Sequence, residues 1–265
     1  MLHYLSDTAA KTLSGWLRSD ITDTDERTLA ARPYQELDTD VARALGIEIV
    51  EGAPIILATD PTRRIGHLRI AAMGHNDVIA IDNIGWTGTC VGGLRILGSD
   101  CAIVLEDIGG LYVNFETMLL RSHGQIMFWG RGASAVGLSV ELEGEGRSCV
   151  IGDDALISNG VWVRNYDMHA VHDLASGRQI NRPPCDTVLE RHVWLGQDAL
   201  LLNCEWIGMG SIIGARALAK GVVPPHCIAA GTPARVLREG TSWGRSSSGM
   251  TAAERASIGL VNRSR

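Results

Sequence analysis

Residues 189–218 read LERHVW-LGQDAL-LLNCEW-IGMGSI-IGARAL, five units of six residues that follow one another without a gap. Each unit begins with Leu or Ile, and the second residue is Gly in three of the five. Because six is an even number, the first residue of every unit faces the same side of an extended chain. A bend in each unit then winds the strand around an axis with the aliphatic residues inside. This stretch predicts a solenoid.

The same frame extends towards the N-terminus. Clear units begin at Ile151, Ile157 and Val163, and weaker copies lie within 81–85, 96–106 and 126–137. We expect the recurrent glycine to supply the unusual backbone dihedrals of each bend. An α-helix would need apolar residues at i, i+3 and i+4, and a flat sheet would need alternation without recurrent glycine. Neither pattern fits as well, so the predicted fold class is an all-β solenoid.

The composition agrees with a narrow core of small branched side chains. Of the 265 residues, 45% are hydrophobic, 31 are Gly and only 5% are aromatic. The net charge of −6 argues against binding to nucleic acid, which needs a basic face. No apolar run reaches the ~18 residues of a membrane span, and Asp7, Lys11 and Arg18 leave no room for a signal sequence. The six cysteines lack metal-ligand spacing and indicate reduced thiols in a cytoplasmic protein.

The repeat is interrupted once. After Val163 the next unit in phase would begin at residue 169, but it begins at Leu189, so twenty residues are inserted. A loop extruded from a regular scaffold is the usual place for function. The predicted loop, at about 168–188, contains His169, His172 and Asp173, and Asp167 directly precedes it.

Four motifs in order give the chain a family resemblance. Residues 165–173 (NYDMHAVHD) resemble the D-x-H-x-x-x-D loop of hexapeptide-repeat acyltransferases, and 192–196 (HVWLG) resemble their h-V-W-I-G segment. Residues 207–215 (IGMGSIIGA) and 230–235 (AGTPAR) are similar to the family's C-terminal motifs. The subgroup that the chain resembles most acetylates polysaccharides, sugars and some antibiotics in bacteria. Met168, His172 and Ala217 depart from the residues usual in the family, so the acceptor pocket is expected to differ.

The resemblance implies a left-handed parallel β-helix with an extruded catalytic loop. It covers about 145–240 strongly and 66–145 weakly. We therefore expect a mainly helical N-terminal capping segment at 1–58, the β-helix acyltransferase domain at 59–240 and a short helical tail at 241–265.

The resemblance also implies a mechanism without a covalent intermediate. His169 matches the family's catalytic histidine and would remove a proton from the acceptor, a task that suits imidazole near neutral pH. Asp167 and Asp173 are both candidates to orient it. The indole of Trp194, or a backbone N–H beside it, is the expected donor to the oxyanion.

Acetyl-CoA is the cosubstrate implied by the resemblance, with no metal. It would lie along the outside of the coil, in the groove between two subunits of a homotrimer. Lys220 and Arg235 are candidates to meet its phosphates. Four small residues are expected to let the pantetheine arm approach the backbone: Gly196, Ala199, Gly214 and Ala215.

The favoured function is acetyl transfer to a hydroxyl of a sugar or polysaccharide. N-acetylation of an amino sugar or antibiotic is the main alternative. A metal-dependent hydratase on the same solenoid would need ligands such as His169, His172 and His192. A β-helix scaffold without catalysis is the remaining alternative, and failure to bind CoA would favour it.

Overall fold

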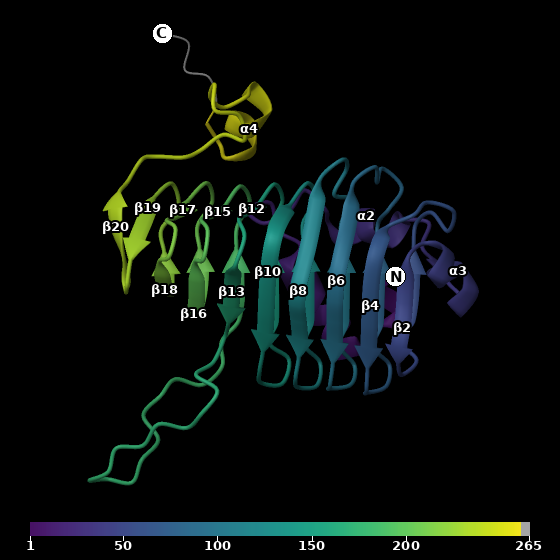
Figure 1. Ribbon diagram of the computed structural model, residues 1–265, viewed down its shortest axis with the longest axis horizontal. Coiled ribbons are helices and arrows are strands. Elements are labelled where there is room, and N and C mark those ends of the chain that lie inside the picture. The colour runs from purple at the N-terminus through teal and green to yellow at the C-terminus, as the bar shows by residue number, and fades with distance from the viewer. Residues whose placement is uncertain (261–265) are drawn as a thin grey trace.

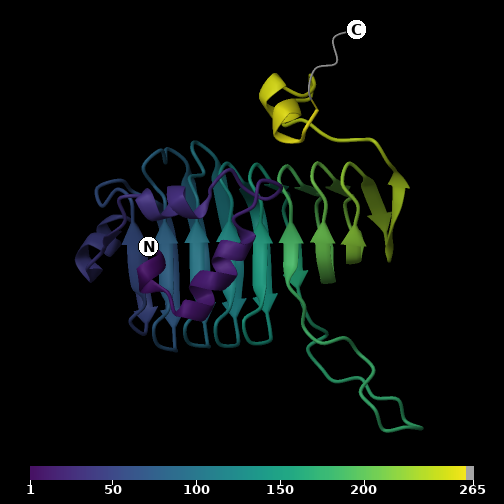
Figure 2. The same cartoon turned by 180° about the vertical axis from the view of Figure 1, so that it is seen from behind.

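The predicted solenoid is confirmed by the computed structural model, which describes residues 1–260 of the chain. Its strands form one continuous sheet that winds around a central axis, with parallel pairing between successive coils. Strands run downwards on the near side in Figure 1 and upwards on the opposite side in Figure 2, and the coils advance steadily along the axis. This sense of winding makes the β-helix left-handed.

The winding divides the sheet into three flat faces, which we name A, B and C. Face A contains β2 (Ile47–Glu51), β4 (Gly66–Ala72), β6 (Thr89–Ile96), β8 (Tyr112–Leu120), β10 (Ser134–Leu142), β13 (Val161–Arg164), β16 (Leu200–Ile207) and β18 (Leu218–Val223). Face B contains β3 (Ile55–Ala58), β5 (Val78–Ile81), β7 (Ala102–Leu105), β9 (Ile126–Trp129), β11 (Ser148–Ile151) and β14 (Thr187–Leu189), and continues into the ends of β16 and β18.

Face C contains β12 (Leu156–Ile157), β15 (Trp194–Leu195), β17 (Ile212–Ile213) and β19 (Ile228–Gly231). In the N-terminal coils its place is taken by the first residues of the long strands of face A. Two short strands pair antiparallel: β1 (Gln35–Glu36) with β3, and β20 (Ala234–Arg238) with β19.

The coil length follows the hexapeptide frame at the C-terminal end. Trp194 pairs with Ile212, a step of 18 residues or three units. Leu156 pairs with Trp194, a step of 38, and the excess of 20 residues is the inserted loop. Upstream, Cys90 pairs with Val113 after 23 residues, because these coils have longer turns. The weak repeats predicted there are therefore true coils of the same solenoid.

The interior is a column of stacked aliphatic side chains. Val163 pairs with Leu201 and Leu201 with Ala219, and all three are fully buried in one continuous core. Each coil adds a layer of this kind, and burial of apolar surface stabilises the stack by about 25 cal/mol per Å². The core is formed by the first positions of the hexapeptide units, as the sequence predicts.

The N-terminal helices lie along the side of the β-helix (Figure 2). The 3₁₀ turn η1 (Leu2–Tyr4), α1 (Asp7–Trp16) and α2 (Glu26–Ala31) cover the outer surface of face B. Leu13 and Leu29 are fully buried there, in one cluster with Phe128 and Val150. These helices therefore protect an apolar sheet face rather than the end of the coil.

Only α3 (Thr39–Ala44) lies at the end of the solenoid, where Ala42 and Leu45 join its core. The two strands after it, β2 and β3, form the first coil, so the expected boundary at residue 58 falls inside the solenoid. The stretch 55–58 does not alternate because it is buried on both surfaces, by the core on one side and by the helices on the other.

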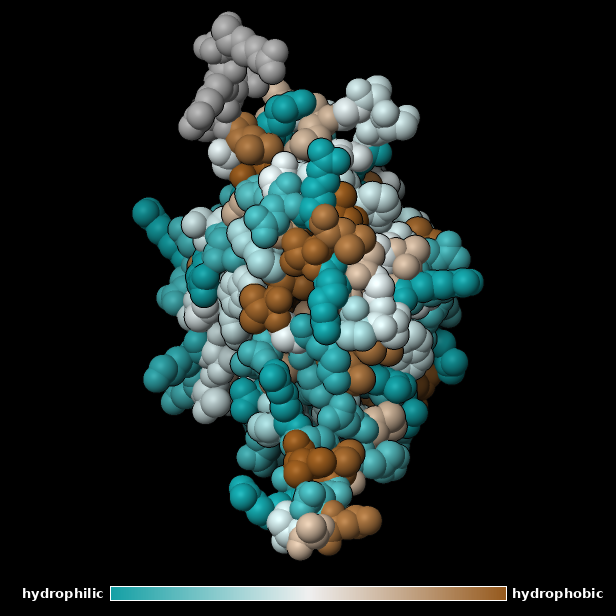
Figure 3. Space-filling model, turned by 90° about the vertical axis from the view of Figure 1, so that its left-hand side faces the viewer, coloured by the Kyte–Doolittle hydropathy of each residue, from teal (hydrophilic) through white to brown (hydrophobic). Residues whose placement is uncertain are grey.

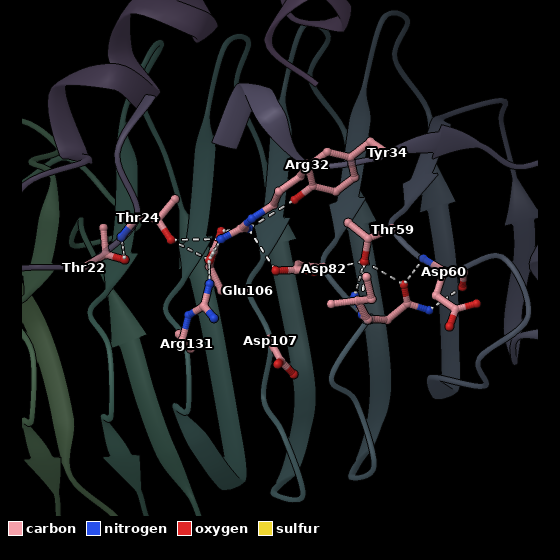
Figure 4. A network of polar contacts seen from close by, with 12 residues as sticks. Thr22, Thr24, Arg32, Tyr34, Thr59, Asp60, Asp82, Glu106, Asp107 and Arg131 are labelled. Atoms are coloured by element: carbon pink, nitrogen blue, oxygen red, sulfur yellow. Dashed lines mark hydrogen bonds and ion pairs between the residues drawn. The ribbon is translucent and has the colours of Figure 1, made fainter. Parts of the chain in front are cut away.

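A buried ion cluster fastens the N-terminal segment to the coil (Figure 4). The Arg32 guanidinium donates two hydrogen bonds to the Glu106 carboxylate, each 2.5 Å long, and lies 3.2 Å from Asp82. Thr24 donates to Glu106 as well, at 2.8 Å. The Glu106 side chain is completely buried, so its charge depends on these partners.

The tail folds back over the corner between faces B and C and ends in the short helix α4 (Ala252–Ser257). Trp243 stacks on His192 with ring centroids 4.1 Å apart, and its indole N–H donates to the His192 carbonyl. The Arg245 guanidinium donates to the Asp154 carboxylate at 2.6 Å. Within residues 1–260, the helices are all too short or too polar to span a membrane.

Candidate active site

The inserted loop leaves the coil between β13 and β14, and projects from the molecule in Figure 1. Asn165 joins its two ends at the neck. The fully buried Asn165 amide donates to the carbonyls of Glu143 and Cys185 and accepts from the Glu143 N–H. The Cys185 N–H donates to the Asn165 carbonyl. These bonds fix the neck although the rest of the loop is exposed.

Beyond the neck the loop forms a narrow hairpin. His172 and Gln179 make an antiparallel bridge, and the Ile180 N–H donates to the Val171 carbonyl. Leu174 at the tip is 96% exposed. Hydrophobic patches on this projection are visible at the bottom of Figure 3. Apolar side chains on an extended arm are typical of a segment that contacts another molecule.

His169 lies at the base of this hairpin with an exposed imidazole. The backbone N–H of His169 donates to the Asp167 carbonyl at 2.8 Å, and the backbone carbonyl of His169 accepts from the Asn181 side-chain amide at 3.1 Å. These contacts hold the backbone on both sides of the imidazole. The loop therefore presents His169 from a defined position.

The two candidate orienting carboxylates lie in different places. Asp167 is half-buried beside the coil and accepts from the Asn203 amide at 3.0 Å. Asp173 lies in the hairpin tip, where it accepts from the N–H and the hydroxyl of Ser176. These hydrogen bonds lower the pKa of Asp173 from its ordinary value. Asp167 thus lies at the base of the loop, two residues before His169, and Asp173 lies in the hairpin turn.

Two neighbouring pockets open at the neck. The first, of about 410 Å³, is lined by Asp167, Asn181 and Lys220 among others, and we call it the loop pocket. The second, of about 440 Å³, extends to Trp16 of helix α1; we call it the Trp16 pocket. Arg182 and Asn203 line both pockets, so the two pockets adjoin.

Asn203 is a residue of this site that the sequence analysis missed. It is 3% exposed and has a positive φ of 50°, where the ladder of β16 shifts its register against β18. Its Oδ1 is buried without a hydrogen-bond partner in the described structure. The signal was an amide inside the otherwise aliphatic start of the unit LLNCEW. A buried amide oxygen without a partner, beside a pocket, indicates a place for a ligand or water.

Trp194 lies on face C, whereas the loop leaves at the corner between faces A and B. Its indole N–H donates to the Ser158 hydroxyl at 3.3 Å, and its ring lies 6.0 Å from that of Trp243. Within one chain, Trp194 and His169 therefore belong to different faces of the coil.

The expected CoA-binding residues fall into two groups. Gly196, Gly214 and Ala215 stack in the turns between faces C and A, where a Cβ on Gly196 would lie 2.6 Å from the Ala215 nitrogen. Arg235 is exposed on β20 nearby, whereas Lys220 lies on face A in the loop pocket. The Ala199 methyl is buried in the core, so Ala199 could meet a ligand through its backbone alone.

His192, one of the three imidazoles that the hydratase alternative would need, is enclosed in the structure. Its imidazole is fully buried, with Nδ1 2.6 Å from an Asp154 oxygen and Nε2 2.8 Å from the Trp243 carbonyl. The C-terminal tail, which the repeat pattern does not include, covers it. His169 and His172 lie on the projecting loop instead. Over residues 1–260, no group of three or more His, Cys, Asp or Glu side chains is arranged to hold a metal ion.

Comparison with known proteins supports the resemblance. No family model matches the chain. It is 26% identical over 146 residues to a protein named as a lipopolysaccharide biosynthesis O-acetyl transferase, WbbJ of Escherichia coli strain K12. This match covers 45% of the chain and 74% of the relative. By sequence, the chain is similar to proteins named as bacterial O-acetyltransferases.

Two further relatives are matched over shorter stretches. Identity to a polysialic acid O-acetyltransferase of Escherichia coli O1:K1 is 28%, over 42% of the chain and 36% of the relative. Identity to a chloramphenicol acetyltransferase of Agrobacterium fabrum is 39%, over 22% of the chain and 27% of the relative. The chain thus spans about a third of the length of these two relatives.

The solved structure of the polySia-specific acetyltransferase NeuO shares the fold. The TM-score is 0.51 at 20% sequence identity, over 68% of the chain and 90% of the NeuO chain. The left-handed β-helix predicted from the motifs is thereby confirmed.

Proposed function

We propose that this protein transfers an acetyl group from acetyl-CoA to a hydroxyl of a sugar or polysaccharide. The observation that carries the proposal is the loop pocket at the base of the extruded loop, because two of its lining residues, Asp167 and Asn181, hydrogen-bond to the backbone of His169. The relatives named as O-acetyltransferases of lipopolysaccharide, polysialic acid and galactosides support the choice of a carbohydrate acceptor.

In the proposed mechanism the acceptor hydroxyl attacks the thioester carbonyl directly. The His169 imidazole takes the hydroxyl proton as the C–O bond forms. The tetrahedral intermediate then expels the CoA thiolate, which recovers the proton from the imidazolium, so the base is restored. Asp167 is our candidate to favour the imidazolium, because it is the carboxylate that lies at the base of the loop.

Acetyl-CoA is proposed to lie against the stacked turns that contain Gly196, Gly214 and Ala215. Closely packed small residues leave the backbone accessible there. Arg235 is exposed beside these turns and could meet a phosphate. Lys220 lies in the loop pocket, where it could stabilise negative charge near His169.

The proposed functional unit is a homotrimer with active sites between subunits. Trp194 and His169 lie on different faces of one chain, so a site that uses both needs Trp194 of a second subunit. The outer surface of face A offers a contact area, because Trp162, Leu200 and Leu218 pair side by side there and are only half-buried. The six unpaired thiols fit a cytoplasmic location, where acetyl-CoA is available.

A panel of sugars and oligosaccharides incubated with acetyl-CoA tests the function. Mass spectrometry should find a product heavier by one acetyl group, and mild alkali should remove it, because esters hydrolyse under conditions that amides survive. If only amino sugars were acetylated and the products survived alkali, the reaction would be N-acetylation and not O-acetylation. Failure to bind CoA in calorimetry would contradict an acyltransferase altogether.

A further inference from the structure

The Trp16 pocket combines a residue from outside the part of the chain that resembles the acetyltransferases, Trp16, with lining residues between 147 and 206, which lie within that part. One wall is helix α1, which ends at Trp16, and the opposite wall is the return leg of the loop, Arg182–Asp186. Val188 and Trp206 of face B also line it. The N-terminal segment and the catalytic loop therefore build this pocket together.

Two indoles give the pocket its apolar surface. Trp206 is held in place, because its N–H donates to Glu190 at 3.0 Å and the Arg18 guanidinium lies 5.3 Å from its ring centroid. The Trp16 N–H is buried and has no partner in the described structure. Aromatic faces with a few directed polar groups are typical of sites for small polar ligands. An unpaired indole N–H adds a donor for a ligand oxygen.

The charges of this pocket are already paired. Arg182 lies 3.1 Å from Glu205, and Arg147 lies 3.5 Å from Asp186. Asp186 also accepts the Ser148 N–H at 2.8 Å. No excess of positive charge remains for a phosphate, so the polar groups suit hydroxyls, which both donate and accept hydrogen bonds.

The Trp16 pocket adjoins the loop pocket at the base of the extruded loop. Asn203 and Arg182 line both pockets. The Asn203 side-chain amide donates to the Asp167 carboxylate, and the Asp167 backbone carbonyl accepts from the backbone N–H of His169. The buried Asn203 Oδ1 has no partner in the described structure. Two adjoining pockets with shared polar residues suit an elongated ligand.

Because the Trp16 pocket and the loop pocket adjoin, we infer that the Trp16 pocket binds a sugar unit of an oligosaccharide or polysaccharide acceptor. This unit would lie next to the one that is acetylated at His169. The inference rests on the proposed function. It makes Trp16 a specificity-determining residue that selects chains over single sugars, and gives the N-terminal helix a role in acceptor recognition.

Steady-state kinetics with sialic acid and galactoside oligomers, each compared with its monomer, test the inference. The variant Trp16→Ala should raise the KM for the oligomer about ten-fold, the factor that corresponds to the loss of a well-packed contact, and leave the monomer's KM and the kcat unchanged. Trp16→Phe keeps the ring without the N–H and should raise the KM for the oligomer about five-fold. Lys11→Ala, on the exposed side of the same helix, is the matched control.

Equal changes of KM for monomer and oligomer, or no change for the oligomer, would overturn the inference. Binding of fluorescently labelled chain to an array of these glycans separates this outcome from failure of the proposed function. Weaker oligomer binding by Trp16→Ala than by Lys11→Ala supports the site even where no acetyl transfer is detected. Array signals that are identical for the variant and the unchanged protein would contradict it.

Discussion

At the scale of single residues, the recurrent glycine has a different role from the one expected. Gly196, Gly208 and Gly214 do not have positive φ angles; Asp198, Gly210 and Arg216, two positions later, do. Glycine is needed instead because neighbouring turns stack too closely for a side chain. The hexapeptide pattern therefore predicts where the turns occur, but close contact between coils depends on stacking that one unit does not reveal.

Replacement of Gly196 by Ala should therefore destabilise the protein by about 1–3 kcal/mol, through a clash with the Ala215 nitrogen 2.6 Å away. Gly93→Ala is the matched control, because Gly93 lies in β6 with no positive φ and no atom within 4 Å of an added Cβ. Its effect should stay within about 0.5 kcal/mol. Midpoints of urea unfolding measure both, and equal shifts would refute the stacking explanation.

His169 and Asp167 could be named as candidates because the loop carries a motif and interrupts a regular frame. Asn203 could not, because its importance arises from a buried amide oxygen and a shifted register in β16. The burial of His192 could not be predicted either, because Trp243, fifty-one positions later, covers it. Contacts between segments so far apart leave no periodic signal in the sequence.

At the scale of elements, the N-terminal segment is fastened by a buried charge. Arg32→Met should cost about 3–5 kcal/mol of unfolding free energy, because it leaves Glu106 buried with Asp82 and without its main cation. Arg43→Met removes an exposed ion pair with Asp40 on helix α3 and should cost less than about 1 kcal/mol. Thermal unfolding monitored by circular dichroism distinguishes the two. A small loss for Arg32→Met would show that the cluster contributes little.

The C-terminal tail should respond to acid. Burial alone would raise the pKa of Asp154, but the hydrogen bond from His192 and the Arg245 guanidinium outweigh it, and the pKa lies below its ordinary value. The lowered pKa means that Asp154 contributes stability above about pH 4, the ordinary value for Asp, and that this contribution is lost as the pH falls through the lowered pKa.

Unfolding free energies between pH 6 and 3 test this expectation. The unchanged protein should lose more stability over this range than Asp154→Asn, whose side chain does not titrate. Parallel pH profiles would mean that the carboxylate does not hold the tail in place.

The sequence predicts some of the strands and helices better than others. The regular coils after Ser148 follow from the hexapeptide frame, whereas β2 and β3 fall within the N-terminal segment expected at 1–58, because no hexapeptide unit marks them as part of a coil. The side-on packing of α1 and α2 on face B depends on apolar side chains such as Phe128 and Val150 on the outside of the coil. A repeat analysis follows the inside of the coil and does not identify its outer contacts.

At the scale of the whole molecule, a trimer would bring loops and coils of different subunits together. Sedimentation equilibrium should give three times the 28.4 kDa mass of the chain. Leu200→Lys, on the outer surface of face A, should shift the equilibrium towards monomers, since it places a charge in an apolar contact. Ile84→Lys, on an exposed turn away from face A, is the control. A monomeric wild-type protein would contradict the assembly.

Faces B and C are partly covered within the chain, face B by the N-terminal helices and the corner beside face C by the tail. This leaves the outer surface of face A and the projecting loop as the main surfaces available for assembly. The arrangement of the whole chain therefore agrees with active sites that form where face A and the loop meet a neighbouring subunit.

The central claim, that His169 is the base on the extruded loop, is tested most directly by the rate of acetyl transfer in paired loop variants. His169→Ala should lower kcat by at least ~10²-fold while CoA binding by calorimetry stays unchanged. His172→Ala, three residues along the same exposed loop, should keep most of the activity. Near-normal turnover by His169→Ala would contradict the account.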